Sequence, residues 1–190
     1  MKNIYKQQLQ EKTARISRQF ADFLGDMTLA IFESPTEHFR QRAEFRLWHV
    51  RRNDGTNTGE SFYAMFEAGK KASPQTLKRT DQLPIADKRI NELMPKLLAC
   101  LQSQPVLIER LFQVEFLSTL RGEILVTLIY HKTLGDDWEA VAKPLETQLG
   151  IHLIGRSRKQ KIILSQDYVT ETLNVQGRAF TYRQIEGGFT

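Results

Sequence analysis

Cysteine and long apolar runs are both scarce in this sequence, and their scarcity excludes several classes of protein. Cys100 is the only cysteine in 190 residues, which excludes an internal disulfide framework or a multi-cysteine metal site and is typical of a reducing compartment. The longest apolar run, residues 124–130, spans seven residues and contains Thr127, whereas a membrane-spanning helix needs about 20. The polar N-terminus lacks the apolar core of a secretory signal. We therefore expect a cytoplasmic protein with no membrane contact.

Motifs of the common catalytic and metal sites are lacking too. The nearest two of the four histidines are eleven residues apart, so the histidines have no metal-ligand spacing. Phosphate-binding glycine loops and a nucleophile elbow are absent. Cys100 follows Leu97 and Leu98 on an apolar helix, a setting that favours a buried core thiol over a nucleophile. The sequence thus predicts no metal site and no complete catalytic site within these residues.

The positive charge is unevenly distributed, and this distribution indicates a polyanionic partner. The formal net charge is +5, and the pI is about 9.4. Residues 34–52 hold five arginines against two glutamates, a net +3, and residues 155–161 hold four cations and no acid, a net +4. The remaining residues therefore total −2. Concentrated positive charge suits nucleic acid, although two solvated basic loops would give the same pattern.

Hydrophobic periodicity predicts an α+β protein. The predicted elements are, in order, a helix over 4–24, strands from Arg42 and over 60–66 with a turn at 53–59, a loop over 69–82, a helix from Pro84, strands over 111–120 and 123–131 joined at Arg121–Gly122, a helix capped by Asp136 or Asp137, strands over 151–155 and 161–165, an irregular or single-turn segment over 167–173, and a hairpin at 175–179. We expect Pro95 to kink or split its helix. Hairpins outnumber parallel crossovers, which predicts a largely antiparallel sheet with flanking helices.

Two strands have apolar faces whose assignment matters for function. In the strand from Arg42, the apolar residues Ala43, Phe45 and Leu47 alternate with charged ones. In the strand over 111–120, regular alternation puts Phe112, Val114 and Phe116 together on one apolar face.

The charged face of the first strand is a candidate RNA contact. Arg40, Arg42, Arg46 and Trp48 follow one another at steps of two and four residues. Arginine binds phosphate through a planar fork and stacks on bases, and tryptophan adds a stacking platform. The alternative is an outer sheet face with a cross-strand salt bridge, in which Glu44 is the acid.

The basic segment over 155–161 is a second candidate. Its four cations, Arg156, Arg158, Lys159 and Lys161, surround a hairpin tip and cannot all be paired locally. Contact with phosphate and plain solvation are the two readings of such a tip.

Several segments together resemble the bacterial tRNA (uracil-5-)-methyltransferase family over about residues 34–190, that is, the N-terminal half of its members. The matching segments are 34–49 (SPTEHFRQRAEFRLWH), 105–107 with 111–114 (PVL and LFQV), 130–134 (YHKTL), 152–156 (HLIGR), 166–168 (QDY), and 182–184 with 189–190 (YRQ and FT). They occur in family order with near-family spacing. The glycines at 187 and 188 and Pro95 depart from the family pattern.

The resemblance implies a reaction whose machinery lies outside this chain. Members of the family transfer a methyl group from S-adenosylmethionine to C5 of the T-loop uridine of tRNA (position 54). A cysteine thiolate adds to C6, and a general base removes the C5 proton. The family's cofactor-binding segments, nucleophile and base, and the methyltransferase domain of Rossmann-like fold that carries them, correspond to positions after Thr190. We therefore expect residues 1–190 to be catalytically inactive alone.

The resemblance also implies an organisation and a partner. We expect a helical segment over 1–33, an RNA-binding α+β domain over 34–182 and a linker over 183–190. Arg46 and Phe112 would contact the T-arm of tRNA, although Phe112 could instead be a core side chain. Phe189 and Thr190 match the start of the active-site linker. A second RNA with a T-loop-like element is a further candidate partner.

Family members are expected to be monomers. In residues 1–190 alone, an exposed apolar patch where the catalytic domain would pack would allow self-association. The alternatives are a free-standing RNA-binding module without catalysis and, more remotely, an unrelated α+β enzyme that uses a histidine.

Overall fold

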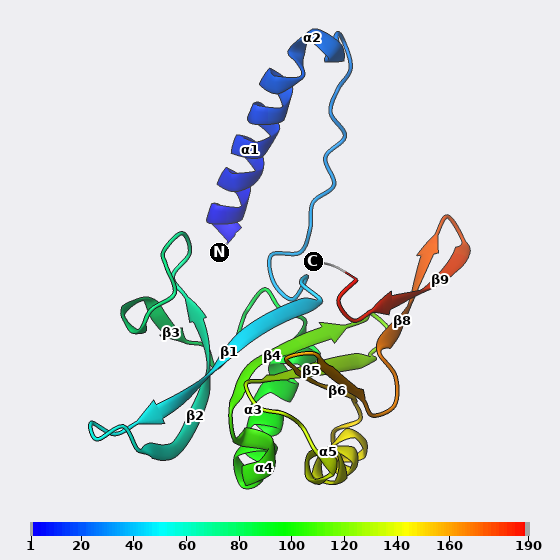
Figure 1. Ribbon diagram of the computed structural model, residues 1–190. Coiled ribbons are helices and arrows are strands. Elements are labelled where there is room, and N and C mark those ends of the chain that lie inside the picture. The colour runs from blue at the N-terminus through cyan, green and yellow to red at the C-terminus, as the bar shows by residue number, and fades with distance from the viewer. Residues whose placement is uncertain (1, 189–190) are drawn as a thin grey trace.

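The computed structural model describes residues 2–188 and is built on one large sheet (Figure 1). Seven strands lie in the order β3-β2-β1-β4-β5-β6-β7, and β8 and β9 form a separate two-stranded ribbon. Each pair in the large sheet is antiparallel except β5 with β6, which confirms the α+β class with a largely antiparallel sheet. The strands are β1 (Arg42–Arg51), β2 (Asn57–Phe66), β3 (Leu77–Arg79), β4 (Leu111–Ser118), β5 (Ile124–Tyr130), β6 (His152–Ser157), β7 (Gln160–Ile163), β8 (Tyr168–Val175) and β9 (Arg178–Ile185).

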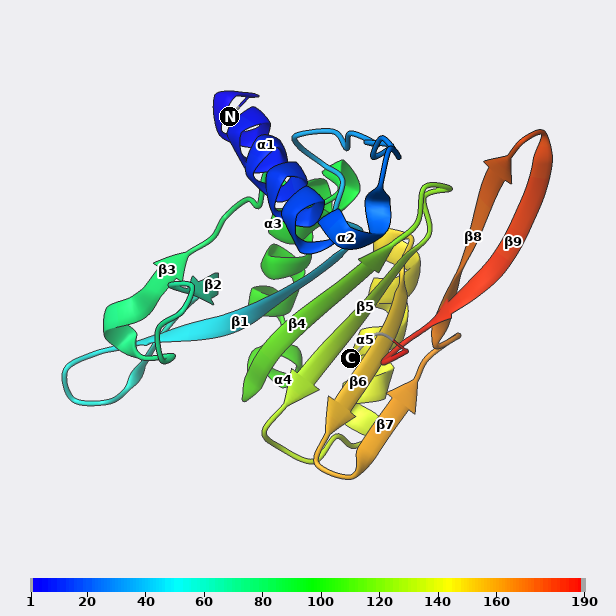
Figure 2. The same ribbon diagram turned by 90° about the horizontal axis from the view of Figure 1, so that it is seen from above.

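Helices α3 (Lys88–Ser103), α4 (Pro105–Ile108) and α5 (Asp136–Leu149) cover one face of the sheet (Figure 2). The predicted apolar side of β1 points toward them, with Phe45 buried against Tyr63 and Phe116. The side of the sheet opposite these helices is called the open face below. Because side chains alternate along a strand, the residues between the buried ones lie on the open face.

Helix α3 begins later than the sequence predicted and is not split. Its first residue is Lys88 rather than Pro84, and the Asp87 carboxylate caps it by accepting from the Arg89 amide at 2.7 Å. The preceding residues pair instead with the segment before β1, where the Asp87 amide donates to the Arg40 carbonyl. Pro95 lies inside the continuous helix.

The β5–α5–β6 crossover is closely packed. The Trp138 side chain is fully buried, and a Cβ on Gly155 would lie 2.5 Å from its ring, so the helix approaches β6 closely only because that residue is glycine. Gly135 is the N-cap of α5 and no side chain caps the helix, so the predicted cap at Asp136 or Asp137 was wrong.

Three further expectations need correction. The predicted loop over 69–82 contains a 3₁₀ turn at Pro74–Thr76 and strand β3, and the predicted irregular segment over 167–173 lies largely in β8. The hairpin between β4 and β5 is longer than a two-residue turn, because the strands end at Ser118 and resume at Ile124.

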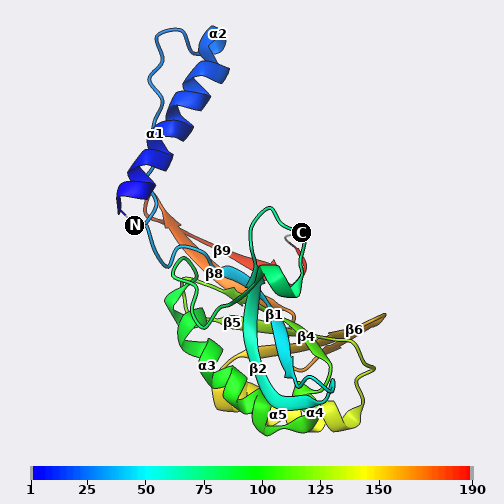
Figure 3. The ribbon, with the colours of Figure 1, turned by 90° about the vertical axis from the view of Figure 1, so that its left-hand side faces the viewer.

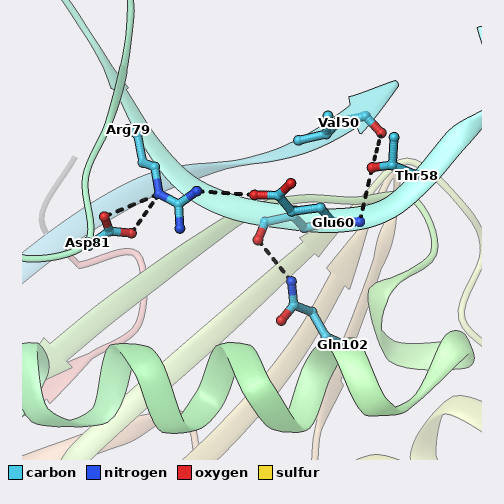
Figure 4. Close-up of polar contacts among 7 residues, drawn as sticks. Val50, Thr58, Glu60, Arg79, Asp81 and Gln102 are labelled. Carbon is cyan, nitrogen blue, oxygen red and sulfur yellow. Dashed lines mark hydrogen bonds and ion pairs between the residues drawn. The ribbon is translucent and has the colours of Figure 1, made fainter. Parts of the chain in front are cut away.

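The edge formed by β2 and β3 is fixed by polar contacts (Figure 4). The Arg79 guanidinium is held by Asp81 at 3.0 Å and by Glu60 at 3.2 Å. From the other side, the Gln102 amide of α3 donates to the Ser61 carbonyl at 2.9 Å. The two carboxylates neutralise the charge of Arg79. The Gln102 bond joins β2 to the helices that cover the sheet.

The N-terminal residues form an arm that stands away from the sheet (Figure 3). Helices α1 (Lys2–Gln19) and α2 (Ala21–Leu24) lead outward, and an extended segment returns to β1. The Ser34 amide donates to the Tyr5 hydroxyl at 2.9 Å and closes the arm at its base. The predicted helical character is confirmed, but apolar side chains of the arm stay exposed, with Phe23 79% and Phe32 92% accessible.

The β8–β9 ribbon is attached to the sheet through two carboxylates, one buried and one partly buried. Glu171, which is 1% exposed, accepts from the Leu120 amide at 2.7 Å, and Glu123 accepts from the Thr170 amide at the same distance. The ribbon turns at Gln176–Gly177, where both residues have positive φ, in the predicted short hairpin. Strand β9 runs to Ile185 and thus continues across the predicted boundary between residues 182 and 183.

Candidate nucleic-acid interface

A β-bulge places Phe112 on the open face. Leu111 pairs with Tyr130 and Gln113 pairs with Ile129, so two steps on β4 correspond to one on β5. A bulge of this kind turns two consecutive side chains to the same side. Leu111 and Val114 are therefore both buried, while Phe112 and Gln113 between them are only partly buried. The expected face of Phe112, Val114 and Phe116 was wrong for Phe112, and the core alternative for this residue falls.

Three side chains from three segments stack at this bulge. The Arg46 guanidinium of β1 lies 3.4 Å from the centroid of the Phe112 ring. The His131 ring, directly after β5, stacks on Phe112 with centroids 4.0 Å apart and planes 29° apart. We call Arg46, Phe112 and His131 the triple stack. A cation over an aromatic face is favourable, and it needs no carboxylate.

Burial lowers the pKa of Arg46 in the triple stack without removing its charge. Removal of water from around the Arg46 guanidinium lowers its pKa. The group remains fully protonated at neutral pH because arginine begins from a very high value. No carboxylate pairs with Arg46 among the ion pairs of residues 2–188, so no acid of these residues neutralises its positive charge.

The other predicted residues of this strand differ in their surroundings. Arg42 pairs with Glu44 at 2.8 Å, so the acid is the one that the outer-face alternative named, but the pair lies within β1 instead of across two strands. Exposed Arg40 donates through Nε to the Arg42 carbonyl at 2.8 Å. Trp48 is partly buried and shares the open face with Arg46, two residues before it. The structure thus brings Arg46, Trp48 and Phe112 to one surface and leaves Arg42 in an ion pair.

The basic turn between β6 and β7 is divided between paired and outward cations. Arg156 binds Glu186 at 2.8 Å, and Lys161 binds both Asp167 at 2.9 Å and Glu186 at 3.1 Å. Glu186 follows β9, and its side chain is only 6% exposed. The two remaining cations, Arg158 and Lys159, lie at the turn itself, where Lys159 has a φ of 62°. Half of the predicted basic cluster therefore faces acids of the same chain.

Histidine contacts give one residue that the sequence reasoning had not selected. His38, His49 and His152 hydrogen-bond to neighbouring backbone or serine atoms. His131 alone of the four stacks on an exposed ring. Its segment, Tyr130-His131-Lys132, lay within the family resemblance, but only the bulge in β4 brings Phe112 opposite it.

Cys100 lies at the edge of the core. The Cys100 thiol packs against the core and is partly exposed rather than fully buried, with the Gln148 amide 3.8 Å from its sulfur. Within residues 2–188 no group of three potential metal ligands gathers, and no helix is long and apolar enough to cross a membrane. Phe189 and Thr190 lie outside the described residues.

Comparisons with known proteins agree on one group of proteins. The family model described as tRNA (uracil-5-)-methyltransferase matches residues 4–190. A tRNA/tmRNA (uracil-C(5))-methyltransferase of Acinetobacter baylyi is 50% identical over 190 residues, covering 100% of this chain and 50% of the relative. The one from Neisseria meningitidis serogroup A is 52% identical over 186 residues, covering 98% and 49%. The chain spans about half the length of these curated relatives.

A solved structure supports the fold. The crystal structure of Pyrococcus abyssi tRNA (uracil-54, C5)-methyltransferase in complex with S-adenosyl-L-homocysteine matches with a TM-score of 0.56 at 13% identity. The match covers 93% of this chain and 42% of the archaeal chain. At this identity the likeness concerns the course of the backbone.

Proposed function

Because the chain belongs to the tRNA (uracil-5-)-methyltransferase family, we propose that it is the RNA-binding half of an enzyme that methylates C5 of a uridine in tRNA. The proposed target is the T-loop uridine, and the proposed methyl donor is S-adenosylmethionine. Support comes from the archaeal relative, whose structure holds S-adenosyl-L-homocysteine and whose name specifies uracil-54. S-adenosylhomocysteine is what remains of S-adenosylmethionine after methyl transfer.

The triple stack is the observation that carries this proposal. A partly exposed aromatic pair with a guanidinium over it offers stacking surface and positive charge at one place. Unpaired RNA bases bind proteins through these two forces. A base that must reach a catalytic pocket first leaves its stack in the folded loop, at a cost of a few kcal/mol. Stacking of a loop base against the outer surface of the triple stack offsets part of that cost.

The remaining proposed contacts supply charge and an additional ring. Arg40, Arg158 and Lys159 are proposed to contact phosphates, which positions the RNA without reading its sequence. Trp48 is proposed as a stacking surface. Arg42, Arg156 and Lys161 are proposed as weaker contributors, because acids of the same chain already pair with them. The T-arm of tRNA and a T-loop-like element of tmRNA are the proposed partners, since the bacterial relatives are named for both RNAs.

The described residues do not fit S-adenosylmethionine. The parallel β5–α5–β6 crossover is the arrangement nearest to a nucleotide site, but the Leu134 amide and carbonyl are both bonded to the Gln160 side chain, at 2.9 and 2.7 Å. Trp138 fills the space over Gly155. We therefore propose that the donor binds in the half of the family's length that this chain does not cover, where the family resemblance also implies the nucleophile and the base.

A methyl-transfer assay separates the main proposal from the alternative of a free-standing RNA-binding module. We expect residues 1–190 to bind a T-arm stem-loop RNA and to incorporate no tritiated methyl group from S-adenosylmethionine. Addition of the second half of the Acinetobacter baylyi relative as a separate chain tests the enzyme assignment. Methylation by the mixture supports it, and binding with no methylation by any such pairing supports the module. Failure to bind the RNA overturns both.

A further inference from the structure

Beside the triple stack, the open face continues into a groove. The second half of β1 forms one wall and the loop before the 3₁₀ turn forms the other. Its lining includes Arg46, Trp48, Arg51, Phe66, Pro74 and Phe112. Because Arg46 and Phe112 belong to both features, the groove begins where the triple stack ends. We call it the Trp48 groove.

The chemistry of the Trp48 groove suits a nucleotide. Its walls carry three aromatic rings and two arginines, and no lining residue is acidic. Arg51 is exposed, and no ion pair of residues 2–188 includes it. Arg79 on the neighbouring edge, by contrast, lies 5.0 Å from the Phe62 ring but is held by Glu60 and Asp81 (Figure 4). Positive charge is therefore available at Arg51 inside the groove and neutralised at Arg79 on the neighbouring edge.

The end of β1 is shaped and fixed at this groove. The pairing register of β1 with β2 shifts between His49 and Arg51, where two steps on β1 correspond to four on β2, so the extra residues lie in β2. Next to this shift, the His49 ring bonds to the Ser61 hydroxyl at 2.9 Å and to the Leu111 carbonyl at 2.7 Å. These bonds fix the part of β1 from which the Trp48 and Arg51 side chains line the groove.

We propose that the Trp48 groove binds a second unpaired nucleotide of the same RNA, next to the one on the triple stack. The base stacks on the Trp48 indole, and the Arg51 guanidinium contacts a phosphate. This inference rests on the proposed function, because it takes the occupant to be the same RNA loop. It adds a second stacking position, so the protein holds two neighbouring bases rather than one.

The two tryptophans of the chain make the proposal directly testable. Trp48 lies in the groove, whereas Trp138 is 0% exposed in the core. A base stacked on an indole quenches its fluorescence, and a buried indole is out of reach. We expect titration with a T-arm stem-loop RNA to quench the wild-type chain. The Trp48→Phe variant, which keeps an aromatic ring and retains Trp138, should bind the RNA with less than about threefold loss and show no quenching.

Affinity measurements give the second arm. We expect Trp48→Leu to weaken RNA binding about tenfold, because the stacking surface is lost. Arg51→Ala should weaken binding about threefold and reduce the slope of log affinity against log salt by about one. The matched control is Lys96→Ala, which removes an exposed cation from α3 on the helix-covered side and should change neither quantity.

Each outcome decides between the two levels of the proposal. RNA binding with equal quenching in wild type and Trp48→Phe, or with full affinity in Trp48→Leu, overturns the Trp48 groove and leaves the proposed function standing. No binding of the RNA by the wild-type chain overturns the proposed function itself. Quenching that depends on Trp48, together with the affinity losses, supports the groove.

Discussion

The triple stack and the basic turn are both cationic, but the structure balances their charges in opposite ways. Arg46 faces the Phe112 ring at 3.4 Å and has no carboxylate partner among the ion pairs of residues 2–188. In the basic turn, Arg156 and Lys161 face Asp167 and Glu186. The sequence has more cations per residue in the turn, yet only part of them is available to a polyanion, because acids of the same chain pair with the rest. Whether a cation is available to RNA therefore depends on acids such as Glu186, which lies far from Arg156 and Lys161 in the sequence.

Loss of the ring should give the largest difference between the two regions. Phe112→Ala removes the surface on which Arg46 and His131 stack, and we expect RNA affinity to fall about 10- to 100-fold, because base–aromatic stacking is worth about 1–3 kcal/mol. The free energy of unfolding should change by less than about 1 kcal/mol, since the ring is only partly buried. Filter binding and thermal melting measure the two effects. The control Phe23→Ala, at an exposed ring of the arm, should leave affinity unchanged.

Exchange of one cation for another tests whether the stack needs a planar group. Arg46→Lys keeps the charge but loses the planar guanidinium that lies 3.4 Å from the ring centroid, so we expect RNA affinity to fall about fivefold with an unchanged salt slope. The same exchange at Arg158, in the turn, should have little effect, since a phosphate contact needs charge. Equal losses at both positions would contradict the distinction between the regions.

The two halves of the basic turn should separate in salt titrations. We expect Arg158→Ala with Lys159→Ala to weaken RNA binding about three- to fivefold and to lower the salt slope by up to about two. Arg156→Ala with Lys161→Ala should leave the slope nearly unchanged and instead lower the melting temperature, because the Glu186 carboxylate loses both partners. The reverse pattern would show that the paired cations serve the RNA.

Release of the paired cations should have the smallest effect. Glu186→Gln keeps the size of the side chain but removes its charge, which leaves Arg156 without an acid and Lys161 with Asp167 alone. We expect a gain in RNA affinity of about twofold or less, with a salt slope raised by up to about one. The nearby control Asp167→Asn releases only part of the charge on Lys161 and should give a smaller gain.

Much of the fold followed from the sequence, because the strand and helix periods are clear around the core. Ala43, Phe45 and Leu47 of β1 were correctly expected on one face, and the short hairpin at Gln176–Gly177 was correctly placed. Strand β8 was missed because its threonines and Glu171 resemble loop residues. That carboxylate is buried where it accepts hydrogen bonds from the Leu120 amide, in the turn between β4 and β5, and from the Thr172 amide.

The candidate site was less predictable, because it depends on departures from regularity. Arg46 and Trp48 could be selected from the pattern of one strand. His131 could not, because its role requires Phe112 to leave the core face, and alternation alone puts that ring inside. The pairing of Arg156 and Lys161 was equally hidden, since Glu186 lies about 25 to 30 residues away and reaches them only through the return of β9.

The bulge at Phe112 has a consequence for how this surface can change. Leu111 and Val114 are three positions apart, an odd number, yet both are buried. In a regular strand an odd separation puts two side chains on opposite sides. Between Leu111 and Val114, β4 thus contains one residue more than regular alternation between two buried side chains needs. Loss or gain of a residue at this point changes the side chains on the open face, while the number of side chains that β4 directs into the core stays the same. Insertions and deletions in relatives can therefore remodel this contact without shifting the register of the core.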